Sequence, residues 1–299
     1  MATVVIDTDP GTDDAIALIM ALNSPELDIR GLTTVGGNAR LTHTTANALR
    51  LLDRLGRPRI PVAAGASRPL RGAYEYGYGF HGSGGLTIPL RPVDGGPHAL
   101  RAAEFIIDAG ASVGPDLTLI ALGPLTNVAH ALQRRPELTM QLREIVVMGG
   151  AFEAGNVTPY AEFNIFNDPA AANVVFSSGV PITLIGLDLG RQVAFGKDQQ
   201  DWAEGDTVGE QLAAEIVREW FDLHPDLPSY DLCDPLTLAG VIEPGLFRYT
   251  QAEVTVATTG PRTGETRAVF GSGPVKVATG VDVDAARALV IDRLKTPEA

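Results

Sequence analysis

The sequence has 299 residues, with 36 Asp or Glu against 23 Lys or Arg, so the formal net charge is −13. A field this negative repels phosphate backbones, which argues against nucleic acid as a partner and leaves small molecules or cations. Because 45% of the residues are hydrophobic and 20% are charged, the chain can bury a core, and wholesale disorder is excluded.

The chain is expected to form one domain over residues 1–299, as α/β chains of this size commonly do. Its one cysteine, Cys233, rules out an internal disulfide and fits a reducing compartment. The start, MATVVIDTDPGTDDA, lacks the positive region of a signal peptide. No stretch approaches the ~18 apolar residues of a membrane span. We therefore expect a cytoplasmic protein without a membrane partner.

Short apolar runs alternate with helical patterns from the first residues onward, which is typical of βαβ units and a largely parallel sheet. The runs predict strands at residues 3–6, 29–34, 117–121, 144–148 and 182–186. Helical spacing predicts helices at residues 13–22, 41–55, 126–133 and 169–177. The predicted fold is α/β, with an open, mostly parallel, twisted, Rossmann-like sheet and helices on both faces.

The last quarter of the chain has a different pattern. Residues 253–258, 266–269 and 275–279 predict β segments joined by Gly-rich turns, which indicates a small antiparallel extension at one edge. Asp282 is the expected N-cap of a closing helix that ends at Leu294. Residues 65–97 and 149–167 fit no regular element, and loops of that length usually cover or line a site.

Four carboxylates, Asp7, Asp9, Asp13 and Asp14, follow the first strand within eight residues. Unless it is fully solvated, such a cluster needs a cation, and oxygen ligands suit Ca²⁺ or Mg²⁺. The alternative is structural, with Asp7 or Asp9 capping the helix and the others solvated in its first turn.

Gly-flanked polar segments also follow three of the other predicted strands, at residues 36–38, 123–127 and 148–150. The carboxyl ends of parallel strands meet at one edge of an open sheet, where such sheets bind ligands. We therefore expect these loops and the aspartates to surround one crevice.

Six motifs resemble the inosine-uridine nucleoside hydrolase family, in that family's order. They are DTDPGTDDA (7–15), TTVGGN (33–38), GPLTNVA (123–129), VMGG (147–150), GNVTPYAEFNIFNDP (155–169) and CDP (233–235). The resemblance implies the nucleoside hydrolase fold and hydrolysis of the N-glycosidic bond of ribonucleosides to ribose and free base. It also implies one bound Ca²⁺ and a homodimer or homotetramer.

Site residues carried over from this resemblance fall into three groups. The implied Ca²⁺ ligands are Asp9, Asp14, Asp234 and the carbonyl of Leu122, with Thr126 as the alternative carbonyl. The implied catalytic residues are Asp9, Asn164 and Cys233, and Asp9 would take a proton from a Ca²⁺-bound water. The implied substrate-binding residues are Asp13, Asn38, His81, Met148, Asn156, Glu162, Phe163, Asn164 and Tyr230.

The sequence departs from the family at Cys233, where many relatives carry a histidine that protonates the leaving base. A thiol is a weaker donor than an imidazolium near neutral pH. One interpretation is that Tyr230, His224 or a chain of waters assists departure. The other is that Cys233 packs, and the base leaves through stabilisation of the oxocarbenium-like transition state.

Aromatic residues carry two further predictions. Tyr74, Tyr76, Tyr78 and Phe80 alternate, so on a strand they would share one face, either stacking on a nucleobase or packing. Trp202 and Trp220 lie in or beside a predicted helix, where core packing is expected.

Two other functions compete with nucleoside hydrolysis. VVIDTD (4–9) resembles the nucleophile strand of haloacid-dehalogenase-type phosphatases, with Asp7 as nucleophile, but the three lysines lie at no strand end. The second is a nucleoside-binding relative that retains Ca²⁺ but has no turnover. Ribose release distinguishes the two, because only a hydrolase would release ribose. The base-facing loops leave purine and pyrimidine preference open.

Overall fold

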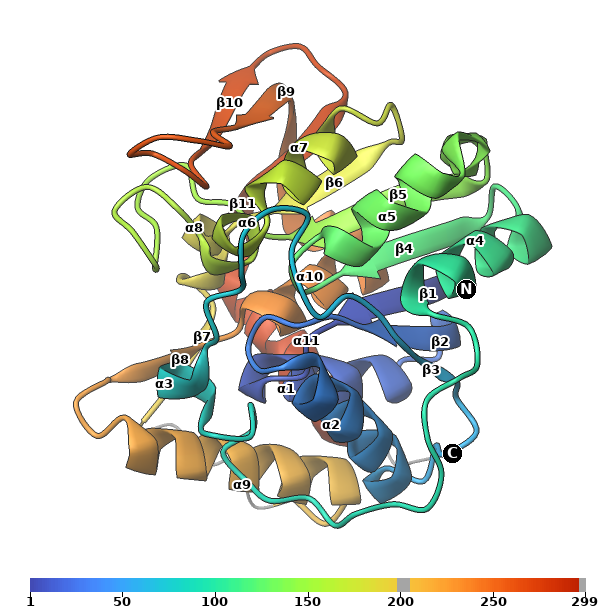
Figure 1. The fold of residues 1–299 in the computed structure, drawn as a ribbon. Coiled ribbons are helices and arrows are strands. Elements are labelled where there is room, and N and C mark those ends of the chain that lie inside the picture. Colours follow the sequence, from blue (N-terminus) through green and yellow to red (C-terminus); the bar gives the residue numbers. More distant parts are fainter. Residues whose placement is uncertain (198–204, 296–299) are drawn as a thin grey trace.

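The computed structural model, which describes residues 1–197 and 205–295, is organised around one nine-stranded sheet (Figure 1). The strand order is β10-β9-β11-β6-β5-β4-β1-β2-β3. The strands are β1 Ala2–Thr8, β2 Leu27–Thr34, β3 Val62–Ala64, β4 Leu117–Ala121, β5 Leu142–Met148, β6 Ile182–Ile185, β9 Phe247–Val256, β10 Thr266–Phe270 and β11 Val275–Val281. A separate two-stranded antiparallel sheet pairs β7 Ala194–Gly196 with β8 Ser229–Asp231.

Helices cover both faces of the sheet, as predicted (Figure 1). One face carries α1 Thr12–Leu22, α2 Leu41–Arg54, α9 Val208–Leu223, α10 Cys233–Ile242 and α11 Val283–Lys295. The other carries α4 Ala102–Val113, α5 Thr126–Arg134 and α7 Pro169–Phe176. Short helices are α3 Tyr78–His81, α6 Phe163–Asn167 and α8 Leu187–Gly190, with 3-10 turns at Pro136–Met140 and Pro244–Leu246.

All five predicted parallel strands are present, and they pair in parallel from β6 through β5, β4 and β1 to β2. The predicted antiparallel extension is also confirmed, because β9 pairs antiparallel with both β10 and β11, while β11 runs parallel to β6. Asp282 precedes α11, and its Oδ1 accepts the Ala285 N–H at 3.1 Å. Strand β9 begins at Phe247, earlier than predicted.

Two expectations about local structure were wrong. The segments 149–167 and 65–97 are not wholly irregular, because residues 163–167 form α6 and residues 78–81, which include Tyr78 and Phe80, form α3 rather than a strand. The alternative in which Asp7 or Asp9 caps α1 is excluded, because the N-cap is Gly11, and Asp14 accepts the Gly11 N–H at 3.0 Å. Elements of three residues, such as β3, are too short to show a hydrophobic period.

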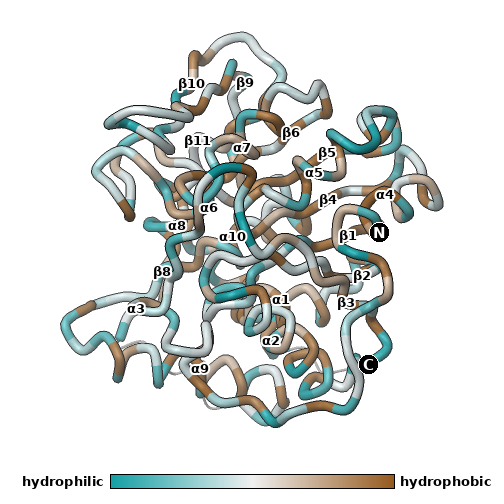
Figure 2. The backbone as a smooth tube through the Cα atoms, in the orientation of Figure 1, coloured by the Kyte–Doolittle hydropathy of each residue, from teal (hydrophilic) through white to brown (hydrophobic). Residues whose placement is uncertain are grey.

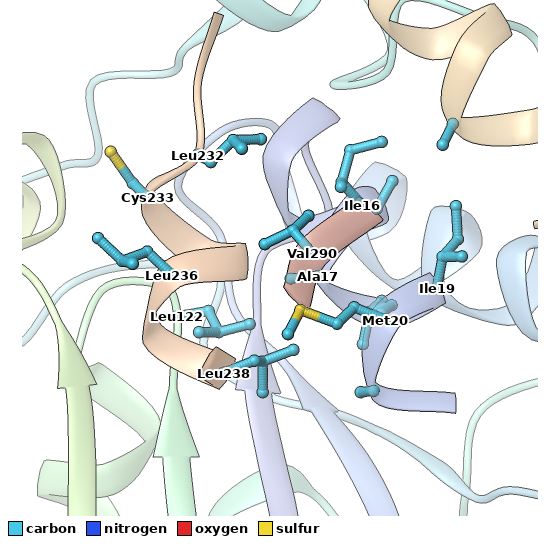
Figure 3. Close-up of a cluster of buried hydrophobic side chains, with 14 of the residues drawn as sticks. Ile16, Ala17, Ile19, Met20, Leu122, Leu232, Cys233, Leu236, Leu238 and Val290 are labelled. Carbon is cyan, nitrogen blue, oxygen red and sulfur yellow. The ribbon is translucent and has the colours of Figure 1, made fainter. Parts of the chain in front are cut away.

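Hydrophobic residues concentrate in the interior strands and on the helix faces against them, while the peripheral turns are hydrophilic (Figure 2). Strands β1 and β4 are buried on both faces, which explains why their sequences do not alternate. Figure 3 shows α1 side chains such as Ile16 packing beside Val290 of α11 and Leu238 of α10. Trp220 is buried in the same core, as predicted, whereas Trp202 lies outside the described residues.

Truncation of a core residue should reduce stability far more than truncation of an exposed one. Leu51 of α2 is fully buried, so Leu51→Ala should lower the free energy of unfolding by about 2–5 kcal/mol. Leu223→Ala is the control, because Leu223 is 47% exposed and should change stability by less than about 0.5 kcal/mol. Urea unfolding measures both, and equal midpoints would contradict the packing described here.

None of the helices in the described ranges 1–197 and 205–295 combines the length and the apolar composition that a membrane crossing requires.

Candidate active site

The polar loops converge at the carboxyl edge of the sheet, as expected. They line a cavity of about 280 Å³. Its walls come from α1, the loops after β2, β4 and β5, the α3 and α6 segments, α8 with the residue that follows it, β8 and the first turn of α10. The lining residues are Asp13, Asn38, Gly77, Phe80, His81, Leu122, Met148, Asn156, Val157, Glu162, Phe163, Asn164, Leu187, Arg191, Asp231, Cys233 and Asp234.

Three carboxylates meet at the floor of this cavity. Asp13, Asp14 and Asp234 each place an oxygen within 4.8 Å of the other two. Burial, and next the charge of Asp14, raise the pKa of Asp13 to about 8, and burial also raises the pKa of Asp14 and Asp234. Buried, mutually repelling carboxylates gain most from a divalent cation, and a set of oxygen donors suits a hard ion.

Asp14 is held in place by four donors. Its Oδ1 accepts the Thr8 hydroxyl at 2.5 Å and the Asp9 N–H at 3.1 Å, and its Oδ2 accepts the Gly11 N–H at 3.0 Å and the Asn38 side-chain amide at 2.9 Å. The side chain is therefore oriented before any ligand arrives, which reduces the entropic cost of binding.

Asp9 lies next to this group and is fully buried. Its Oδ2 accepts the Asn38 N–H at 2.7 Å, while its Oδ1 has no hydrogen-bond partner among the described residues. A Cβ at Gly37 or Gly123 would come within 2.1 or 2.4 Å of the Asp9 oxygens, so only glycine permits this approach. Burial, and next the charge of Asp14, raise the pKa of Asp9 well above its usual value. A buried, unpaired carboxylate oxygen is a suitable ligand or base.

The segment 156–164 contributes several of the residues implied for sugar binding. Glu162 caps α6, with its carboxylate accepting the N–H groups of Asn164, Ile165 and Gly150 at 2.8 to 3.0 Å. The Asn164 amide donates to the Leu122 carbonyl at 2.7 Å and to the Met148 sulfur at 3.2 Å. These bonds join the loops that follow two neighbouring strands, β4 and β5, into one wall.

Of the two carbonyl alternatives, only Leu122 belongs to a residue that lines the cavity. Thr126 is buried at the start of α5, where its hydroxyl bonds to Asp168 and Tyr74, both at 2.7 Å. The Thr126 hydroxyl is therefore occupied by bonds within the fold. The assignment of the metal-binding carbonyl to Leu122 stays a prediction.

His81 reaches the cavity from α3 and contacts the start of α1. Its Nδ1 accepts the Thr12 N–H at 3.1 Å, which leaves the ring proton on Nε2. Burial, and next the charge of His224, lower the pKa of His81 to about 3. His81 is thus a neutral imidazole near pH 7, a hydrogen-bonding group rather than a source of imidazolium protons.

Cys233 also lines the cavity. The sequence left open whether it takes part in catalysis or only packs. Its sulfur points away from the α1 core side chains (Figure 3), and burial raises the pKa of its thiol well above the usual range. The thiol therefore stays protonated at neutral pH, which makes it an unsuitable nucleophile.

The two residues considered as helpers of base departure lie elsewhere. Tyr230 is fully buried, with its ring 4.8 Å from that of Trp220. His224 Nε2 lies 2.9 Å from the Phe80 carbonyl, and neither residue lines the cavity. Of the four alternating aromatics only Phe80 lines it. Tyr74 is buried against Thr126, and the rings of Tyr76 and Tyr78 pack against each other.

Five lining residues were not singled out from the sequence. Gly77 and Val157 lie in the two long segments expected to line a site, whereas Leu187 at the start of α8, Arg191 just after α8 and Asp231 at the end of β8 lie outside them. Only their positions after predicted strands or before the CDP motif could have indicated them. Asp7, by contrast, is sealed in the sheet by Thr33 and Asn127 at 2.5 and 2.8 Å, which removes it as a phosphatase nucleophile.

Comparisons with known proteins agree with this geometry. Residues 4–288 match the family model described as inosine-uridine preferring nucleoside hydrolase. The chain is 38% identical to probable uridine nucleosidase 2 of Arabidopsis thaliana, over 97% of both chains. It is 41% identical to the pyrimidine-specific ribonucleoside hydrolase RihA of Photobacterium profundum, over 87% of this chain and 86% of that one.

Solved structures of nucleoside hydrolases share the fold of this chain. A plant nucleoside hydrolase superimposes with a TM-score of 0.93 at 35% identity, over 99% of both chains. A purine-preferring ribonucleoside hydrolase from Gardnerella vaginalis superimposes with a TM-score of 0.92 at 31% identity, over 98% of both chains.

Proposed function

Because the chain belongs to the inosine-uridine preferring nucleoside hydrolase family, and so hydrolyses the N-glycosyl bond of ribonucleosides, we propose that its cavity does this with one Ca²⁺ ion. The proposed ligands are Asp9, Asp14, Asp234 and the Leu122 carbonyl. The observation that carries the proposal is the group of mutually repelling carboxylates, with Asp14 and Asp234 buried and Asp13 half-buried. Beside it, Asp9 Oδ1 has no hydrogen-bond partner among the described residues.

Ca²⁺ bound there would hold the ribose 2′- and 3′-hydroxyls and raise the acidity of a neighbouring water. Asp9 then takes the proton from the attacking water. Its Oδ2 is fixed by the Asn38 N–H, which leaves Oδ1 as the accepting atom.

The remaining walls bind and orient the ribose. We assign sugar-hydroxyl contacts to Asp13, Asn38, Asn156, Glu162 and Asn164, with Met148 and Phe163 packing on the ring and His81 donating from Nε2. Each of these except Asp13, Asn156 and Phe163 is buried, so the site is largely preorganised. Carboxylates around C1′ stabilise the positive charge that develops as the bond breaks.

Ribose release tests the proposed function. We expect the purified protein to release ribose from uridine or inosine in the presence of Ca²⁺, and to lose that activity after treatment with a chelator. A nucleoside-binding protein would instead be stabilised against heat by nucleoside and release no ribose. Full turnover in the chelated protein would contradict the metal assignment.

We also propose that residues 1–299 act as one domain, in the cytoplasm, as a homodimer or homotetramer. The single free cysteine, Cys233, supports a reducing compartment such as the cytoplasm. Analytical ultracentrifugation tests the subunit number, with a monomer as the contradicting result.

A further inference from the structure

Part of the cavity lining differs in chemistry from the carboxylate cluster. Leu187 is the first residue of α8, and Arg191 follows its last residue. The Arg191 guanidinium donates to the carbonyl of Gly155, two residues before Val157, and all three of Leu187, Arg191 and Val157 line the cavity. These residues place apolar surface beside one exposed guanidinium, which suits a flat heterocycle better than a polyhydroxylated sugar. Asp231 lines the same cavity and lies close enough to Arg191 for their charges to interact.

Asp231 has a fixed backbone and a free carboxyl group. The antiparallel pairing of β8 with β7 aligns Asp231 with Ala194, and the following Leu232 N–H donates to the Val193 carbonyl at 2.9 Å. No donor among the described residues bonds to the Asp231 carboxylate, and it forms no direct salt bridge with Arg191, whose guanidinium is occupied by the carbonyls of Ala154 and Gly155 at 2.6 and 2.9 Å. The carboxyl group is therefore available to a ligand.

The other acidic groups on the cavity wall already have partners in the fold or in the carboxylate cluster. Glu162 accepts three backbone N–H groups, and Asp13 and Asp234 belong to the carboxylate cluster. The two neutral candidates are no better as acids. His81 becomes an imidazolium only far below neutral pH, and burial raises the pKa of the Cys233 thiol well above its usual range. Burial raises the pKa of Asp231, against a smaller lowering by Arg191, which favours a protonated carboxyl group.

Resting on the function proposed above, we propose that Asp231 is the catalytic acid that binds and protonates the leaving nucleobase. The C1′–N bond breaks with its electron pair passing to the base, and the base takes a proton from the Asp231 carboxyl group. The water that adds to C1′ gives its proton to Asp9. Exchange with solvent returns the proton from Asp9 to Asp231, so the sum is nucleoside plus water to ribose plus base.

The test compares leaving groups in the Ca²⁺-loaded enzyme. Asp231→Asn should lower kcat for inosine and uridine by about 10²–10⁴-fold, the typical contribution of a general acid. Turnover of a nitrophenyl riboside should be unchanged, because nitrophenolate leaves without a proton. Asp231→Glu, which restores a carboxyl group, should recover part of the nucleoside activity. Asp231→Ala gives a second measure of the ratio of nucleoside turnover to nitrophenyl riboside turnover.

Asp226→Asn is the matched control, since Asp226 is exposed in the turn before β8 and the substitution makes the same exchange of a carboxyl group for an amide. Unchanged nucleoside turnover in both Asp231→Asn and Asp231→Ala would overturn the proposal. So would an equal loss for nucleosides and the nitrophenyl riboside, because that pattern places Asp231 at the sugar or in the fold. If the wild-type protein turns over only the nitrophenyl riboside, the proposed function itself fails, which is a distinct result.

Discussion

Asp9→Asn is expected to lower kcat for uridine and inosine by about 10²–10⁴-fold, the usual contribution of a general base, while leaving the fold intact. The substitution keeps the shape of the side chain, and the amide oxygen can still accept the Asn38 N–H that Oδ2 accepts now. What it removes is the oxygen that takes the proton of the attacking water. Initial rates of ribose release at saturating substrate measure the effect.

The control for Asp9→Asn is Asp116→Asn, because Asp116 is exposed in the turn before β4. It should leave turnover unchanged. Thermal unfolding and circular dichroism show whether each variant is folded. Wild-type-like kcat in a folded Asp9→Asn protein would remove Asp9 from the mechanism, and the attacking water would then need another base.

Removal of divalent metal should abolish nucleoside hydrolysis and lower the thermal stability of the protein. A ligand that binds only the folded state stabilises it by about 2.7 kcal/mol at about 100 times its Kd, and here it also relieves repulsion among Asp13, Asp14 and Asp234. Calorimetry with and without Ca²⁺ measures the change. The matched variant is Asp234→Asn, which should melt at the same temperature with and without Ca²⁺.

A chelated protein that keeps its melting temperature, together with a Ca²⁺ response in Asp234→Asn equal to that of wild type, would contradict the site. Loss of activity without loss of stability would indicate that the ion arrives with the substrate.

The Ca²⁺-dependent rise in melting temperature should also increase with pH. Burial, and next the charge of Asp14, raise the pKa of Asp13 from 3.8 to about 8. Between these values the folded, metal-free protein binds more protons than the unfolded chain, so the contribution of this group to stability is present at low pH and is lost as the pH rises to about 8. Ca²⁺ displaces these protons. A smaller Ca²⁺ effect at about pH 8 than at about pH 6 would contradict this assignment.

The central fold could be predicted because its strands are long and buried on both faces. Runs such as residues 117–121 contain no charged residue and only one polar one, Thr118, and helices such as α1 carry an apolar face and clear ends. The short strands β7 and β8 could not be predicted, since three residues show no period. Helix α10 was also missed, because its first turn holds Cys233, Asp234 and Pro235, residues that signal a site rather than a helix.

The candidate site could be predicted in part. The cluster around Asp14 and the segment with Glu162 and Asn164 follow directly from strand ends and motifs, and the structure brings them together at one cavity. The proximity of the Asp13 carboxylate to those of Asp14 and Asp234 was not predicted, and its contact with the sugar stays a prediction. Asp231 and Arg191 gave no signal, because their position depends on the pairing of β7 with β8 and on the turn after α8.

The position of the cation is tested most directly by anomalous diffraction from crystals of the protein grown with Ca²⁺. We expect one peak on the cavity floor, within bonding distance of Asp9, Asp14, Asp234 and the Leu122 carbonyl, with open coordination positions toward the cavity. No peak there, or a peak bound by Asp13 and Asp14 without Asp9, would contradict the proposed ligand set and with it the role of Asp9 beside the attacking water.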